Sequence, residues 1–97
     1  MSVIETLTFR LAADTDEAVF LDADRRVQTE FHYHQPGLLR RTTARDRHGE
    51  WMVIVLWRSE RDAEAAAELS KSDRATSELI GLVDRTTLRT HRYSTLD

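Results

Sequence analysis

Histidine side chains are the candidates for proton transfer in this sequence. Two of them lie one residue apart in the segment His32-Tyr33-His34, and His91 follows near the end of the chain. An imidazole titrates near neutral pH, so His34 or His91 could take a proton from a phenol or an enol. Arg41 or Arg89 could then stabilise the oxyanion that forms. We therefore take His34 and His91 as the candidate catalytic residues.

The same histidines offer a second chemistry, which is metal binding. In an extended backbone, His32 and His34 would share a face and provide two imidazole ligands, with His91 as a third. No Asp or Glu completes an obvious site, and the dipole at a helix end favours exposed histidines there. We therefore expect no metal, and surface histidines are the simpler interpretation of the pair.

Aromatic and basic side chains are candidates for holding a flat substrate. Trp57 ends an apolar run next to an expected helix start, which favours a place on a cavity wall, and Tyr33 lies between two histidines. Trp51 is expected in the core or at a subunit interface, where aromatic residues are common. Arg41 belongs to a basic cluster that a solvated edge strand also explains. The candidate substrate-binding residues are Tyr33, Arg41 and Trp57.

Composition excludes several classes of function. The chain of 97 residues contains no cysteine, which removes disulfides, thiolate metal sites and cysteine nucleophiles. A net charge of −3 argues against nucleic acid or an anionic membrane as the main partner. Kinase, nucleotide-binding and serine-hydrolase motifs are absent. With no leader pattern and no membrane-spanning run, we expect one cytoplasmic domain over residues 1–97.

Four segments have the alternation or apolar content that is typical of strands. Their expected bounds are residues 3–11, 38–45, 51–57 and 86–93. The second and third are joined by a hairpin loop in which Gly49 can take a positive φ.

The first helix is expected between the first two strands. Asp14 and Glu17 have the spacing of a capping box, and the helix must end before Pro36. Its buried stripe consists of residues at helical spacing, namely Phe20, Ala23, Val27 and Phe31.

The second helical segment follows the third strand. Ser59, with Asp62 three residues later, predicts its start. We expect a break at 70–73 and a further helical piece to about Val83, with an inner face of Leu79, Ile80 and Val83.

The third strand, Trp51–Trp57, is apolar on both faces. Alternation places Trp51, Val53, Val55 and Trp57 on one face and Met52, Ile54 and Leu56 on the other. A chain of this length can cover one face of a sheet with its own helices but hardly two. The sequence therefore predicts a homodimer in which the second face meets another copy of the chain.

The order of elements predicts the fold. A βαββαβ arrangement forms an α+β, ferredoxin-like domain with a four-stranded antiparallel sheet and its helices on one face. In that topology the first and third strands are central. Arginine side chains on the second and fourth strands agree with edge positions, because charge discourages strand-to-strand aggregation.

Three local patterns carry a family resemblance. They are Phe9-Arg10-Leu11 leading into a helix, Gln35-Pro36-Gly37-Leu38-Leu39 before the second strand, and Val55-Leu56-Trp57-Arg58-Ser59 at the start of the second helix. From Val3 to Tyr93 the chain resembles the dimeric α/β barrel superfamily, and within it the antibiotic-biosynthesis-monooxygenase-like proteins. The resemblance implies two sheets that pack as a barrel and a cavity between each sheet and its helices.

The resemblance does not extend to the haem-degrading members of the superfamily. Those relatives carry an Asn on the first strand and a Trp and a His on the second helix, where this sequence has Leu7, Leu69 and roughly Leu79. We therefore expect no haem and no other cofactor.

Three functions fit these observations. The first is a cofactor-independent, monooxygenase-like enzyme that acts on a small hydrophobic or aromatic molecule. The second is a non-catalytic protein that binds or carries such a molecule. The third is a structural dimer whose interior is filled by its own side chains. An open cavity that contains His34 or His91 would favour the first.

Overall fold

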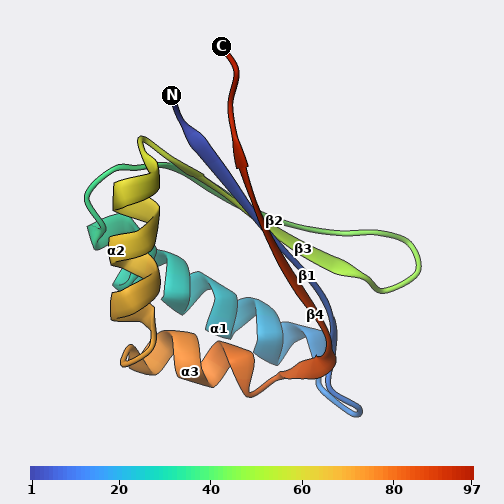
Figure 1. The fold of residues 1–97 in the computed structure, drawn as a ribbon. Helices are drawn as coiled ribbons and strands as arrows, with labels where there is room; N and C mark the ends of the chain where they lie inside the picture. The colour runs from blue at the N-terminus through green and yellow to red at the C-terminus, as the bar shows by residue number, and fades with distance from the viewer.

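The computed structural model describes residues 1–97 and has the predicted ferredoxin-like fold (Figure 1). The elements are β1 (Val3–Leu11), α1 (Glu17–Glu30), the short 3₁₀ helix η1 (His32–His34), β2 (Leu38–Arg45), β3 (Trp51–Trp57), α2 (Glu60–Ser70), α3 (Arg74–Ile80) and β4 (Val83–Ser94). The antiparallel strands lie in the order β2-β3-β1-β4. The prediction that the first and third strands are central is confirmed.

The helices all lie on one side of the sheet, as Figure 1 shows. On β3 the side chains of Trp51, Val53, Val55 and Trp57 are buried beneath them, whereas Met52, Ile54 and Leu56 are only partly buried on the opposite face. The structure thus identifies which face of this strand meets the helices. The other face carries apolar side chains that no element of the chain covers.

Strand register sets which side chains lie under the helices. Arg41 of β2 pairs with Val55 of β3, Val55 pairs with Glu5 of β1, and Glu5 pairs with Arg92 of β4. Because these four residues are aligned across the sheet, they share the helix-facing side with Val55. We call them the Val55 row.

The capping prediction for α1 is wrong by two residues. Asp14 has a φ of 65° and lies in the turn, and the N-cap is Asp16, whose Oδ1 accepts a hydrogen bond of 2.7 Å from the Ala18 amide. A second Asp at the cap position provides the same chemistry without the left-handed backbone. The prediction for α2 is confirmed, because Ser59 Oγ accepts from the Asp62 amide at 3.2 Å.

The predicted stripe of α1 is confirmed, since its four residues are all buried. The last helix ends at Ile80, short of the expected Val83, because the chain turns at Gly81 and Val83 already begins β4. None of the helices is long and apolar enough to cross a bilayer.

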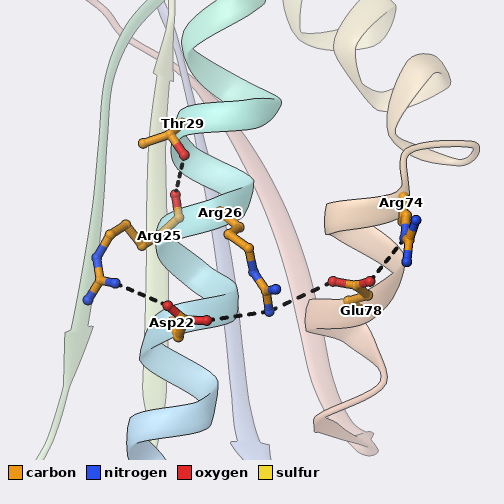
Figure 2. Close-up of polar contacts among 6 residues, drawn as sticks. All are labelled: Asp22, Arg25, Arg26, Thr29, Arg74 and Glu78. Carbon is orange, nitrogen blue, oxygen red and sulfur yellow. Dashed lines mark hydrogen bonds and ion pairs between the residues drawn. The ribbon is translucent and has the colours of Figure 1, made fainter.

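Ion pairs link α1 to α3 on the outer surface of the helical layer (Figure 2). Arg26 contacts Asp22 of its own helix at 3.6 Å and Glu78 of α3 at 3.8 Å, and Glu78 also contacts Arg74 at 3.2 Å. These side chains are largely exposed, so each pair contributes at most about 1 kcal/mol. Of these pairs, only Arg26–Glu78 joins the two helices.

Candidate active site

A cavity of about 200 Å³ lies between the sheet and the helices. The strands contribute Leu7, Phe9 and Val53, and α2 and α3 contribute Ala66 and Leu79. Of the 18 lining residues, 12 are hydrophobic, so the few polar groups among them determine what chemistry the cavity offers.

Arg41 is the first of these polar groups. Its side chain is only 1% exposed, and its Nη2 donates to Asp24 Oδ1 of α1 at 2.7 Å. Thr43 Oγ1 donates to the other carboxylate oxygen of Asp24 at 2.7 Å and accepts from Arg41 Nη1 at 3.3 Å. The charge of Arg41 is therefore neutralised inside the domain. Its Nε remains buried without a hydrogen-bond partner.

His32 is the second polar group. The α-helix ends at Glu30 with Phe31 as its C-cap, and the 3₁₀ turn that follows places His32 on the cavity wall. The centroid of its imidazole is 5.1 Å from that of the Phe31 ring and 6.0 Å from that of the Trp57 ring. Its Nδ1 is buried and has no partner. Burial, and then the nearby charge of Arg41, lower the pKa of His32 to about 4, so the ring is neutral at pH 7.

Trp57 is fixed by a carboxylate. Its Nε1 donates to Glu5 Oε1 at 2.9 Å, and Glu5 Oε2 accepts from Arg92 at 3.0 Å. Glu5 and Arg41 both belong to the Val55 row, with two strand spacings between them, or about 10 Å. The indole is thus held in one orientation on the cavity wall, next to His32.

The structure brings together some of the predicted site residues and separates others. Arg41 and Trp57 both line the cavity. Tyr33 is 59% exposed, and His34 next to it is exposed as well, because the 3₁₀ turn directs only the first of its three residues inward. His91 aligns with Thr6 and, through it, with Ile54, on the face opposite the helices.

The histidine of the cavity is therefore His32, which the sequence analysis considered only as a metal ligand. The sequence contained a signal for the inward position of His32. Phe31 completes the buried stripe of α1, and a tight turn keeps the next residue close to the same surface. As for metal binding, no group of three His, Asp or Glu side chains comes together anywhere in the chain. In particular, His91 lies on the other side of the sheet from His32.

Solved structures with this architecture include oxygenases. SnoaB, a cofactor-independent oxygenase from Streptomyces nogalater, is 19% identical and aligns with a TM-score of 0.78 over 99% of this chain and 94% of its own. A candidate antibiotic biosynthesis monooxygenase from Chloroflexus aurantiacus is 15% identical, with a TM-score of 0.75 over 100% and 95% of the two chains. This chain has their fold.

A third structure, Rv0793 from Mycobacterium tuberculosis, is 14% identical, with a TM-score of 0.73 over 100% of this chain and 97% of its own. No family profile and no curated protein sequence matches the chain. The resemblance to antibiotic-biosynthesis-monooxygenase-like proteins is thus confirmed at the level of fold. At these identities, the chemistry must be argued from the cavity itself.

Proposed function

We propose that this chain is a monooxygenase-like enzyme that uses O₂ to oxidise a small hydrophobic or aromatic molecule in the cavity, without a cofactor. The observation that carries the proposal is a mostly apolar cavity whose lining residues include His32, Arg41 and Trp57. A mostly apolar cavity with a few polar residues in its lining is typical of a small-molecule site. The cofactor-independent oxygenase SnoaB has the same fold, which supports the reaction class.

The reaction balances without a cofactor when the substrate is an electron-rich phenol or enol. For 1-naphthol, O₂ replaces the hydrogen at the para carbon: the C–H and O–H bonds break, and a second C=O bond forms with one oxygen atom of O₂. The other oxygen atom leaves as water. The substrate loses four electrons and O₂ gains four, which gives 1,4-naphthoquinone and one water.

The protein's part is to form the phenolate and shield it from water. His32 takes the phenolic proton, and the positive charge of Arg41 stabilises the oxygen anion. In the empty cavity, burial and Arg41 disfavour the imidazolium. A phenolate beside the ring would offset that penalty, because an adjacent anion favours the charged form of histidine.

A homodimer remains part of the proposal. The outer sheet face carries partly buried Met52, Ile54 and Leu56 of β3 in a central position, next to β1. A second copy packed on this face would remove these side chains from water. This surface lies opposite the cavity, so assembly would leave the His32 site between sheet and helices.

A non-catalytic binding protein is the second candidate. It is favoured by the low pKa of His32, because a base is most effective when its pKa lies near the working pH. A purely structural role required a filled interior, whereas the structure contains a cavity of about 200 Å³.

Oxygen consumption with 1-naphthol separates these functions. We expect uptake of O₂ with release of 1,4-naphthoquinone, and one labelled oxygen atom in the quinone when ¹⁸O₂ is used. The His32→Phe variant should lower kcat/KM by at least about 100-fold, while the exposed, matched control His34→Phe should not. If kcat/KM falls in His34→Phe or His91→Phe but not in His32→Phe, the catalytic base is one of the two histidines predicted from the sequence. Tight binding with no uptake would favour the carrier.

A further inference from the structure

Two of the 18 residues that line the cavity are also exposed to solvent. They are Ala67 of α2 and Thr90 of β4, whereas every other lining residue is buried or half-buried. A residue that lines a cavity and is also exposed lies on its rim. The rim therefore has one exposed residue in the helical layer and one on an edge strand of the sheet.

An ion pair places both rim residues at the same gap. Arg92 Nη1 of β4 lies 3.8 Å from Glu64 Oε1 of α2, and no other side-chain hydrogen bond or ion pair joins these two elements. Residues three apart on a helix are neighbours on its surface, so Glu64 lies about one turn from Ala67 on the same side. Residues two apart on a strand share a face, so Arg92 lies beside Thr90. The ion pair thus crosses the gap that the rim residues border.

Small side chains keep the α2 side of this gap open. The residues that α2 contributes to the cavity lining are Ala66, Ala67 and Ser70. Alanine and serine fill little of the space between a helix and a sheet. A larger group attached at position 67 would therefore obstruct the opening.

Arg92 divides its contacts between the sheet and the helix. Its Nη2 donates to Glu5 Oε2 at 3.0 Å, and the Glu5 side chain is only 14% exposed. The contact with Glu64 is longer, and the Glu64 side chain is 64% exposed. Exposed ion pairs are weak, whereas a sheltered hydrogen bond between charged groups is stronger. The contact with α2 can therefore break while Arg92 stays bound to Glu5.

We propose that small molecules enter and leave the cavity between α2 and β4, and that the Arg92–Glu64 ion pair is a side-chain gate across this entrance. Opening the gate needs no movement of the sheet, because Glu5 keeps the Arg92 guanidinium in place. The entrance lies on the helical side of the sheet, so a second copy on the outer sheet face would leave it open. The inference rests on the proposed function only in that the cavity takes up a small molecule.

Fluorescence quenching of Trp57 by acrylamide tests the entrance, because this indole lines the cavity and is only 1% exposed. The background substitution Trp51→Phe leaves Trp57 as the only tryptophan. The chain has no cysteine, so Ala67→Cys can be labelled at a single place with benzyl methanethiosulfonate, and a reductant removes the label. Labelling should lower the quenching rate constant at least about 3-fold, and reduction should restore it.

Ala65→Cys is the matched control, because Ala65 is also exposed on α2 but does not line the cavity. Its labelled form should be quenched as fast as the unlabelled protein. Labelled Thr90→Cys, on the other side of the rim, should repeat the loss. It decides the question if labelled Ala67→Cys fails to fold, which circular dichroism would show. Glu64→Gln should raise the quenching rate constant about 2- to 5-fold, because it removes the charge that holds the gate.

The other outcomes overturn the entrance or the gate. Unchanged quenching in both labelled rim variants, or an equal fall in labelled Ala65→Cys, would refute the entrance between α2 and β4. If acrylamide quenches Trp57 in none of the proteins, the cavity is closed to small molecules. Equal quenching in Glu64→Gln and its parent would remove the gate and leave the entrance.

Oxygen consumption with 1-naphthol, measured on the same variants, separates the entrance from the proposed function. The expected quenching pattern without consumption would keep the entrance and remove the enzyme. Consumption of O₂ together with unchanged quenching in the labelled rim variants would do the reverse.

Discussion

The neutral, partly buried imidazole of His32 makes the stability of the domain depend on pH. Its pKa is about 4 in the folded protein against 6.5 ordinarily, so between these values the unfolded chain binds a proton that the folded chain does not. Protonation therefore favours unfolding. The contribution of neutral His32 to the free energy of unfolding is fully present above pH 6.5 and is lost as the pH falls toward 4.

The size of the loss follows from the pKa shift. Each pKa unit corresponds to about 1.4 kcal/mol, so the full effect is about 3 kcal/mol. Between pH 7 and pH 4.5 about 2.5 kcal/mol of it should be lost. That is a large share of the roughly 5–15 kcal/mol by which a domain is stable. The groups that influence the imidazole are Arg41 on β2, Asp24 on α1 and Asp73 before α3, and Arg41 acts with burial against the proton.

The assay is urea denaturation at fixed protein concentration between pH 7 and pH 4.5, on the wild type and on His32→Asn. Asparagine does not titrate, while all carboxylates remain, so the difference between the two proteins isolates His32. The wild type should lose about 2.5 kcal/mol more than the variant over this range. The control His34→Asn changes an exposed side chain and should follow the wild type. Parallel pH profiles of wild type and His32→Asn would refute the burial argument.

Three other perturbations test the fold and its assembly. Ile54→Asp should convert the proposed dimer to a monomer in light scattering, while Val19→Asp, on an exposed position of α1, should not; a dimeric Ile54→Asp protein would contradict the interface. Asp24→Asn should lower the free energy of unfolding by about 3 kcal/mol, because it leaves a buried guanidinium without its counter-charge; a loss below about 1 kcal/mol would mean that this charge is hydrated. Asp16→Ala should lower the free energy of unfolding by about 1 kcal/mol, measured by urea denaturation, because it removes the N-cap of α1. Asp14→Gly should leave the free energy of unfolding unchanged, since glycine accepts a φ of 65° more readily. A larger loss in Asp14→Gly than in Asp16→Ala would show that Asp14 is the cap.

Most of the fold could be predicted because the signals are local. Alternation and apolar content located the strands, and Ser59 was a sufficient signal for the start of α2. The error at the start of α1 arose because two nearby residues are both suitable as a cap. Asp14 and Asp16 both have cap chemistry, and only the backbone conformation decides between them.

The site was only half predictable. Arg41 and Trp57 lie on strands, where register and alternation determine direction. The histidines lie in a 3₁₀ turn, in which the direction of each side chain depends on how far the helix continues. The pairing of Asp24 with Arg41 joins residues 17 positions apart through tertiary packing, which no spacing in the sequence reveals.

The Val55 row also has a consequence for folding fidelity. A strand that slips by one residue turns every side chain to the other face. For β1, such a slip would carry Glu5 away from the Trp57 indole and the Arg92 guanidinium, leaving these donors without their acceptor. A slip of β2 would likewise separate Arg41 from Asp24. The polar groups beside the cavity thus penalise misaligned sheets, so these side chains favour the native register of strand pairing.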